Sequence, residues 1–374
     1  MKSLNRVEIS RSALIHNFEI CRQRADGAVL MPLVKADGYG HGMIECARIF
    51  AEQGAAAFGV AEAVEGVRLR EAGITQPVLV LVGVVPQTLP DIVAARLTPV
   101  VTDASILPEL SRLAGAKGIE IGVHLKLDAG MGRQGVLPAG FVDLVQAVHG
   151  SAHLRLDGVM AHLPLADDRQ SANSDEVLRT FLKTTAALAD CGHGTCCLHL
   201  ANSGGLFYVA GARLDMVRPG IALYGYYPDG AAGAAAASSP RLRPAMRYLT
   251  HIIQVRHVPA GSGLGYAHLF TTVRPSTIAV LPVGYANGYL RTLTNRAEVL
   301  VGGRRAPVVG RISMNLTLVD VTDLPEPRVG DEVVLLGRQG QEEIGADEIA
   351  GWMDTISYEV LCLFGQLNPR VMVD

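Results

Sequence analysis

Residues 28–54 read AVLMPLVKADGYGHGMIECARIFAEQG, and this stretch contains both halves of a strand–helix unit. Its first part, residues 28–35, is a short apolar run that ends in a lysine, a pattern typical of a buried strand. Its last part, residues 43–54, spaces its apolar side chains as a helix does and ends in glycine, a common residue just past a helix. A strand that leads directly into a helix predicts a parallel sheet with crossover helices.

The same alternation continues as far as residue 225. Seven further apolar runs are candidate strands, at residues 57–60, 77–83, 97–102, 122–128, 156–162, 196–202 and 216–225. Helical patterns lie between them, for example at residues 64–73 and 175–192. Eight candidate strands in roughly 200 residues favour a closed (β/α)8 TIM-like barrel, with an open doubly wound sheet as the alternative.

The pattern changes near residue 230. Residues 229–244 (DGAAGAAAASSPRLRP) are small, polar and bounded by proline, as in a linker or an exposed loop. Short β-rich stretches then follow at residues 248–258, 277–284, 297–303, 304–321 and 330–337. One late amphipathic helix is expected at residues 345–354. We therefore expect a barrel domain over residues 1–232 and a mainly β domain over residues 233–374.

Composition excludes several classes of protein. The chain has 374 residues, 49% of them hydrophobic, and a formal net charge of −3, so it lacks the clustered Lys/Arg excess that a nucleic-acid surface needs. Its most apolar stretch, residues 77–85, is far shorter than the ~20 residues that a membrane helix requires. The N-terminal residues show no signal peptide pattern. We expect a cytoplasmic protein that binds neither nucleic acid nor membrane.

Neither cysteines nor histidines predict a metal site. The six cysteines have no CxxC spacing and no disulfide framework, and we expect idle or buried thiols. The 11 histidines are dispersed, without an HExxH or similar ligand pair.

Lys35 stands at the carboxyl end of the first candidate strand, where barrels place their chemistry. Burial would lower the pKa of this lysine and make a neutral amine available for Schiff-base formation, while the glycines that follow would let a planar cofactor or a phosphate approach the backbone. The spacing matches neither a phosphate loop nor a dinucleotide fingerprint. On the local pattern alone, a lysine whose ammonium reaches out to water beside a glycine-rich turn is equally compatible.

A wider set of motifs resembles the pyridoxal-phosphate-dependent alanine racemase family. Nine segments occur in the order that this family uses: VKADGYGHG (34–42), HLKLDAGMGRQG (124–135), GVMAHL (158–163), HLANSGG (199–205), DMVRPGIALYG (215–225), GLGYAHLF (263–270), LPVGYANGY (281–289), VGRISMN (309–315) and ISYE (356–359). The resemblance implies a (β/α)8 barrel followed by a mainly β domain, and an isomerase that interconverts L-alanine and D-alanine and supplies D-alanine for peptidoglycan.

The resemblance also implies how pyridoxal 5'-phosphate is held. Lys35 matches the lysine that forms the Schiff base with the cofactor. The residues that match the family's phosphate contacts are Tyr39, Ser203, Gly220, Ile221 and Tyr358. Arg218 matches the arginine that faces the pyridine nitrogen. A guanidinium stays protonated and cannot make that nitrogen cationic, so the carbanion should be short-lived and racemisation favoured over transamination.

Racemisation needs a base on each face of the α-carbon. By resemblance Lys35 serves the D-side and Tyr266 serves the L-side, with His162 hydrogen-bonded to the tyrosine. A free tyrosine has a pKa of about 10, so Tyr266 needs such help. In the family this tyrosine reaches the lysine of the other subunit, which implies a homodimer with shared active sites.

The remaining matches concern the amino-acid substrate. Arg133 matches the arginine that binds the substrate carboxylate, and the backbone of Met314 matches a second contact to it. Lys126 matches a lysine that is often carbamylated in this family. Tyr285 and Arg291 fall where the family lines its access corridor.

Two positions depart from the commonest pattern of the family. Asn315 and Asn287 stand where aspartates are usual, and each change removes a negative charge while preserving shape. Asn315 lies beside the substrate-binding segment, which leaves open a broader racemase that also accepts serine.

Two other classes of function fit the sequence less well. A basic amino-acid decarboxylase of related fold would carry a Cys–Asp motif that is missing here, since Cys362 has no adjacent acid. A non-catalytic cofactor-binding barrel would lack both the second domain and Tyr266.

Overall fold

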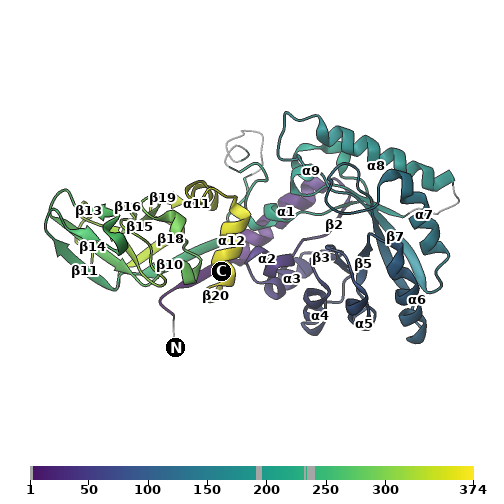
Figure 1. The fold of residues 1–374 in the computed structure, drawn as a ribbon, viewed down its shortest axis with the longest axis horizontal. Helices are drawn as coiled ribbons and strands as arrows, with labels where there is room; N and C mark the ends of the chain where they lie inside the picture. The colour runs from purple at the N-terminus through teal and green to yellow at the C-terminus, as the bar shows by residue number, and fades with distance from the viewer. Residues whose placement is uncertain (1–2, 191–195, 231–232, 234–240) are drawn as a thin grey trace. The chain divides into compact units, whose positions relative to one another are not determined.

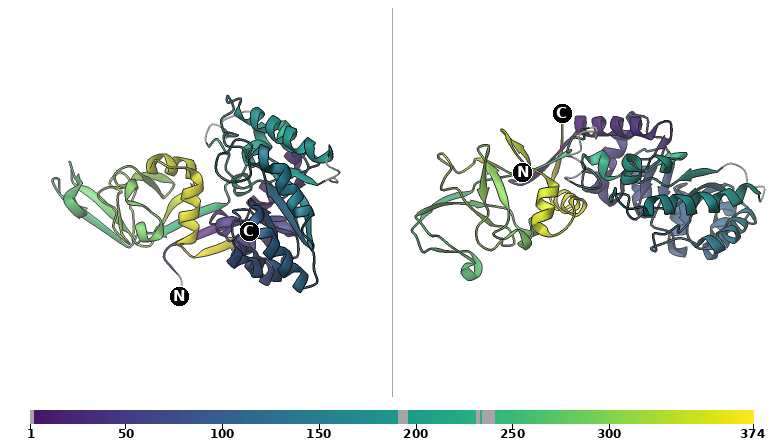
Figure 2. Two further views of the ribbon diagram at one scale, coloured as in Figure 1. Left: turned by 45° about the vertical axis from the view of Figure 1, so that its right-hand side comes forward. Right: turned by 90° about the horizontal axis from the view of Figure 1, so that it is seen from above.

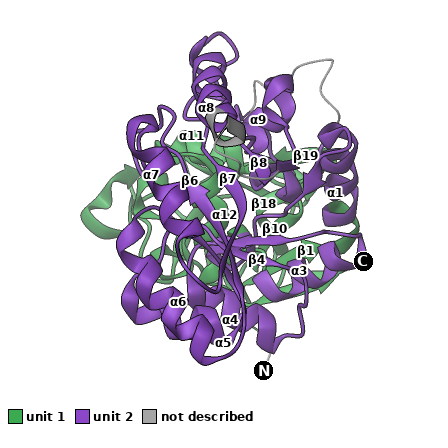
Figure 3. Ribbon diagram, turned by 90° about the vertical axis from the view of Figure 1, so that its right-hand side faces the viewer, with its two compact units in different colours: residues 1–13, 39–42, 243–374 green, residues 14–38, 43–242 purple. Residues whose placement is uncertain are grey.

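The computed structural model describes residues 3–190, 196–230, 233 and 241–374. The chain divides into two units, drawn in different colours in Figure 3. Residues 14–38 and 43–242 form the first, which we call the barrel unit. Residues 1–13, 39–42 and 243–374 form the second, which we call the β unit.

The barrel unit is built on parallel strands. Six of them form one sheet in sequence order: β3 (Phe58–Val60), β4 (Val78–Val80), β5 (Thr98–Val101), β6 (Ile121–Lys126), β7 (Leu154–Met160) and β8 (Cys197–His199). Two more, β2 (Val29–Leu30) and β9 (Met216–Val217), pair with each other in parallel.

Backbone hydrogen bonds join this pair to both edges of the six-stranded sheet. On the β3 side, the Val34 amide donates to the Gly59 carbonyl over 2.9 Å. On the β8 side, the Arg218 amide donates to the Ala201 carbonyl over 2.9 Å. The eight strands therefore close into a ring. The expected (β/α)8 barrel is confirmed, and the open doubly wound sheet is wrong.

Helices surround these strands (Figures 1 and 2). They are α1 (Arg11–Ala25), α3 (Met43–Glu52), α4 (Ala63–Glu71), α5 (Leu89–Ala94), α6 (Leu107–Ala116), α7 (Pro138–His149), α8 (Asn173–Asp190) and α9 (Ser203–Tyr208). α3, α6 and α7 bury apolar side chains along one side, as a 3.6-residue period predicts. Phe50 of α3, for example, stacks on Phe18 of α1 with ring centroids 5.6 Å apart. No helix in the described ranges is long and apolar enough to cross a membrane.

The last candidate strand of the barrel is shorter than expected. Residues 216–225 read as one strand, but the ladder ends after β9 and a 3₁₀ helix, Ile221–Tyr224, follows. Pro219 explains the change, because it has no N–H to donate to a neighbouring strand.

The β unit contains three small sheets. The largest has the order β16-β15-β18-β10-β1-β20, with β19 beside β18, and the others are β11-β14-β17 and β12-β13. The strands are β1 (Arg6–Ser10), β10 (Met246–His251), β11 (Gln254–Val258), β12 (Gly263–Leu264), β13 (Phe270–Thr271), β14 (Ser276–Leu281), β15 (Glu298–Val301), β16 (Arg304–Pro307), β17 (Thr317–Asp320), β18 (Glu332–Gln339), β19 (Glu342–Ile344) and β20 (Arg370–Val373). The mainly β second domain is confirmed. The late helix is α11 (Ala346–Met353), and α12 (Ser357–Gln366) follows it without having been predicted.

The start of the chain belongs to the β unit, whereas the sequence analysis placed it in the barrel domain. Strand β1 pairs antiparallel with β10, Val7 opposite Tyr248, and parallel with β20, Val7 opposite Arg370. These partners are remote in sequence, so no local pattern reveals them. Apart from Gly233, the alanine-rich residues 231–240 beside the expected domain boundary lie outside the described part of the chain.

Candidate active site

The candidate lysine begins a left-handed turn. In α2 (Lys35–Tyr39), φ and ψ are 52° and 46° at Ala36, 54° and 47° at Asp37, and 65° and 43° at Gly38. This conformation costs about 1–2 kcal/mol for each L-residue, and glycine escapes the penalty. The Asp37 carboxylate helps to hold the turn, because it accepts a hydrogen bond from the Met43 amide at 2.9 Å. The backbone is therefore strained in the turn that directly follows Lys35.

Gly40 makes room for a helix. A Cβ atom at Gly40 would lie 2.2 Å from the carbonyl oxygen of Leu361 in α12. A Cβ at Gly365, also in α12, would lie 1.8 Å from the Gly40 carbonyl oxygen. The glycines after Lys35 were expected to let a cofactor approach the backbone. Gly40 allows the close approach of two backbone segments of the β unit.

The same segment brings two of the expected phosphate ligands together. The rings of Tyr39 and Tyr358 lie with centroids 6.0 Å apart. Burial raises the pKa of the Tyr39 phenol, and Tyr358 and Cys362 raise it further. Tyr39 is therefore a neutral hydrogen-bonding group.

Arg218 is the most deeply buried charged side chain of the expected site, at 1% exposure. Its Nη1 donates to Nδ1 of His199 over 3.0 Å, and its Nη2 donates to the carbonyls of Ala161 and Leu200 over 2.7 and 3.0 Å. Nη2 also lies 3.4 Å from Nδ1 of His162. Burial lowers the pKa of Arg218 to about 10, which still leaves it charged at neutral pH. The guanidinium is thus held in one orientation by two carbonyl oxygens and a histidine nitrogen that accept its hydrogen bonds.

A second histidine continues this chain of hydrogen bonds. Nε2 of His199 lies 2.7 Å from Nδ1 of His124. Because Arg218 donates to Nδ1 of His199, the proton of His199 sits on Nε2 and is donated to His124. Burial lowers the pKa of His124 to about 4 and that of His199 well below its usual value, so both stay neutral. Neither histidine was among the predicted site residues. Each lies in a strand that carries one of the family-like motifs, and that position was the signal that could have identified it.

His162 marks the place where the basic side chains of the barrel unit converge. Its pKa is lowered far below the usual value, mainly by burial. The charges of four basic residues lower it further: Arg218, Lys126, Arg133 and Lys35. Four predicted basic side chains therefore act electrostatically on one neutral imidazole.

Lys126 is buried, with 4% exposure. Burial lowers its pKa to about 7, helped by the charges of Arg218 and Arg133 and opposed by Asp128. A large neutral fraction is therefore present at neutral pH. The neighbouring loop is shaped by Asp128, whose Oδ1 accepts from the amide of Met131 at 2.9 Å and from the flanking glycine amides at 3.1 Å. This loop presents Arg133, whose side chain is exposed.

The third expected group, Ser203, Gly220 and Ile221, is also assembled. The Ser203 hydroxyl accepts from the Gly220 amide over 2.9 Å, so its own O–H remains a donor. The buried Ile221 amide begins the 3₁₀ helix, and no hydrogen-bond acceptor meets it among the described residues. Unsatisfied donors at a helix start are suited to an anion such as phosphate.

The other predicted residues lie in the β unit. Tyr266 is 69% exposed and Met314 is 56% exposed. The Ala286 amide donates to the Met314 carbonyl over 3.0 Å, so the turn with Tyr285 lies beside the segment with Asn315. Both Asn315 and Arg291 are exposed.

Asn287 has a structural role that an aspartate could not fully fill. Its Nδ2 donates to Oδ1 of Asn368 at 3.5 Å, and its carbonyl accepts from Nδ2 of Asn368 at 2.9 Å. A carboxylate has no N–H for the first contact.

Two family models cover this architecture. "Alanine racemase, N-terminal domain" matches residues 9–228, and "Alanine racemase, C-terminal domain" matches residues 245–372.

Individual relatives agree with the family models. The chain is 41% identical over 362 residues to an alanine racemase of Syntrophobacter fumaroxidans, covering 96% of this chain and 95% of the relative. It is 39% identical over 364 residues to one of Halothermothrix orenii, covering 97% and 95%.

Solved structures extend the likeness to the fold. The alanine racemase of Streptomyces lavendulae superposes with a TM-score of 0.93 at 32% identity, covering 100% of this chain and 98% of that one. The alanine racemase of Bartonella henselae, solved with covalently bound pyridoxal phosphate, gives a TM-score of 0.89 at 27% identity, with 100% of both chains covered. Both units of this chain are matched, from the first strand to the last, and the chain therefore belongs to the alanine racemase family.

Proposed function

We propose that this chain interconverts L-alanine and D-alanine by a two-base mechanism. Family membership makes it a pyridoxal-phosphate-dependent isomerase. The observation that carries the proposal is Arg218, a buried cation that is held by neutral histidines and carbonyls in the ring of strands that bears Lys35. An arginine there suits proton exchange without loss of the amino group.

The residues of the barrel unit fit the cofactor. Lys35 would supply the amine, while Ser203 and Ile221 would offer donors to the phosphate. Tyr39 and Tyr358, which belong to the β unit, are the other residues proposed to contact the phosphate. When bound, pyridoxal phosphate makes the α-hydrogen of an amino acid acidic by delocalising electrons. Arg218 has a pKa of about 10, stays protonated and donates hydrogen bonds to fixed acceptors, so it would not protonate the pyridine nitrogen and would limit how far those electrons are drawn away.

Two side chains exchange the α-proton, one on each face. Lys35 acts on the D-side and Tyr266 acts on the L-side. Tyr266 is 69% exposed in the single chain, and a phenolate base works better when enclosed. We propose that a second copy of the chain encloses it, so that the active enzyme is a homodimer in which His162 of one subunit hydrogen-bonds Tyr266 of the other.

The substrate carboxylate is bound by Arg133 and by the backbone amide of Met314. Lys126 supports this task as a carbamate. Its neutral amine adds CO₂ to form an N-carboxylate and releases one proton, which places an anion among the neighbouring cations. The low pKa of Lys126, about 7, supplies the neutral amine.

The product serves peptidoglycan synthesis in the cytoplasm. A broader racemase that also accepts serine is the second candidate. It is favoured by Asn315, an exposed residue next to Met314 that lacks the negative charge usual in the family at this position.

Within the described ranges, no three His, Cys, Asp or Glu side chains are grouped to hold a metal ion.

The test is α-proton exchange in D₂O. Purified protein with pyridoxal phosphate is incubated separately with L-alanine, D-alanine and L-serine, while deuterium uptake and optical rotation are followed together. Exchange with loss of rotation for both alanine enantiomers supports the proposal, and comparable kcat/KM for serine supports the broader enzyme. A cofactor-loaded protein that exchanges none of the three refutes both.

A further inference from the structure

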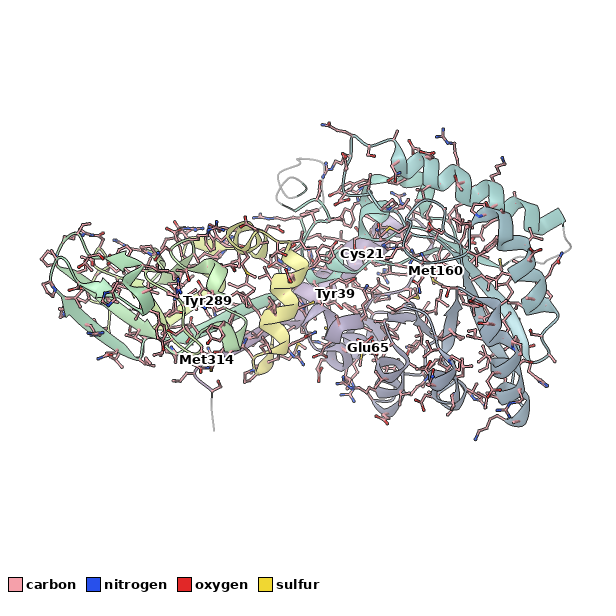
Figure 4. The ribbon with its side chains drawn as sticks, viewed as in Figure 1. Cys21, Tyr39, Glu65, Met160, Tyr289 and Met314 are labelled. Atoms are coloured by element: carbon pink, nitrogen blue, oxygen red, sulfur yellow. The ribbon has the colours of Figure 1, made fainter. Side chains whose placement is uncertain are left out.

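Glu65, labelled in Figure 4, ties the lysine-bearing turn to a neighbouring element. It lies in the first full turn of α4, the helix that follows β3. Its Oε1 accepts from the amide of Ala36, the residue after Lys35, at 2.8 Å. Its Oε2 accepts from the amide of Ala61 at 2.6 Å and from that of Glu62 at 3.3 Å. One carboxylate therefore joins the lysine-bearing turn, the residue that follows β3 and the start of α4.

The acceptor role of both oxygens sets the chemistry of this position. A carboxylate can accept at each oxygen and is favoured near a helix N-terminus. A glutamine of the same shape has one accepting oxygen and one amide group that only donates. Whichever way it turned, that amide would face a backbone N–H. Only an acid satisfies both sides.

The turn that Glu65 holds is one that would relax without support. Ala36 and Asp37 adopt the left-handed conformation, with φ of 52° and 54°, which L-residues rarely populate. A change at Ala36 rotates the backbone directly attached to Lys35. The anchor on the Ala36 amide is thus well placed to control where the lysine amine lies.

We propose that Glu65 is a positioning residue for Lys35, holding the left-handed turn that aims the lysine amine at the cofactor aldehyde. The inference rests on the proposed function in one respect, since it takes Lys35 as the cofactor-binding lysine. Backbone amides occupy both carboxylate oxygens of Glu65, so its role is to hold the turn.

The experiment compares Glu65→Gln with a matched control, Glu71→Gln, an exposed acid at the end of the same helix. Full-length apoproteins are titrated with pyridoxal phosphate and followed by the visible absorbance of the lysine adduct. Borohydride reduction and peptide mass spectrometry then measure the fraction attached to Lys35. We expect E65Q to bind at least about tenfold more weakly and to lose the adduct band, and E71Q to match the wild type.

A rescue separates positioning from general stability. Glycine adopts the left-handed conformation without penalty, so Ala36→Gly in the E65Q background should recover about threefold or more of the lost affinity. Wild-type behaviour of E65Q overturns the proposal, and so does a loss that A36G does not relieve. Should E65Q fail to fold, judged by circular dichroism and thermal unfolding, Glu65→Asp takes its place, with the same expected loss and the same rescue.

Adduct formation at Lys35 does not depend on racemisation. A wild-type chain that loads the cofactor on Lys35 but racemises no alanine refutes the proposed function and leaves this test in force.

Discussion

The Arg218 guanidinium donates to Nδ1 of His199 over 3.0 Å, and His199 passes a hydrogen bond to His124 over 2.7 Å. All three groups are buried. The donor and the acceptor in each of these two hydrogen bonds follow from the arginine, which can only donate. Two neutral histidines therefore orient the one buried cation that the proposed chemistry needs.

Replacing His199 by phenylalanine should destabilise the protein and impair activity. The ring volume is retained, but Nη1 of Arg218 loses its acceptor in a buried place. A buried group left unsatisfied costs about 1–3 kcal/mol, more when it is charged. Urea unfolding should show that loss of stability. Arg218 would also no longer be held in one orientation, and we expect kcat to fall by about tenfold, which corresponds to a rise of about 1.4 kcal/mol in the activation free energy. The control is His257→Phe, an exposed histidine of β11, and equal effects of the two variants would contradict the assignment.

Stability should depend on pH through Lys126. Its pKa is lowered to about 7 in the folded protein and is about 10.4 in an unfolded chain. Between these values the unfolded state binds more protons, so the free energy of unfolding rises with pH across this window. The slope is at most about 1.4 kcal/mol per pH unit.

The comparison that isolates this effect is Lys126→Met, which keeps the volume and removes the titration. Urea unfolding at pH 7, 8 and 9 should show the wild type gaining stability relative to K126M as pH rises. The buffers are kept free of CO₂ so that Lys126 stays an amine, and parallel curves for the two proteins under these conditions would rule out a buried, titrating lysine.

Gly365→Ala should disrupt the β unit. The added Cβ would lie 1.8 Å from the Gly40 carbonyl oxygen, a distance no relaxation of a side chain can relieve, because the obstacle is backbone. We expect a loss of more than about 2 kcal/mol of unfolding free energy, at the upper end of overpacking effects.

Gly351→Ala is the matched control for that clash. It lies in α11, where an added Cβ meets nothing within 4 Å. Alanine is favoured over glycine inside a helix by about 1 kcal/mol, so G351A should be neutral or slightly stabilising. If G365A unfolds at the same temperature as G351A, the close approach of the two backbones is not required.

Tyr266→Phe should slow racemisation in both directions by about 10²–10⁴-fold, the usual contribution of a general acid–base group. Exchange of the α-proton of D-alanine should persist, because Lys35 is the base proposed for that face, whereas exchange from L-alanine should stop. Isotope uptake measured separately for each enantiomer distinguishes this from a general loss. Tyr285→Phe, in the same unit, should retain exchange with both, and symmetrical losses in Y266F would exclude two different bases.

Local pattern was sufficient for much of the molecule. Helical spacing with glycine just past the last turn predicted α3 and α4, helical spacing predicted α8, and apolar runs predicted the strands of the ring. The motifs around Lys35, Lys126, His162, Ser203 and Arg218 pointed to one site, and the structure groups the basic members around His162.

The sequence by itself determined the barrel and the mainly β second domain, because periodicity and turn residues act over a few neighbouring positions. Only the tertiary structure decided that β1 pairs with β10 and β20 and that the backbone of α12 packs closely against Gly40. It also decided that His199 and His124 orient Arg218. Each of these depends on contacts between residues far apart in the chain. Which strand edge, backbone or hydrogen-bond acceptor becomes available is settled when the elements pack, and no local pattern carries that information.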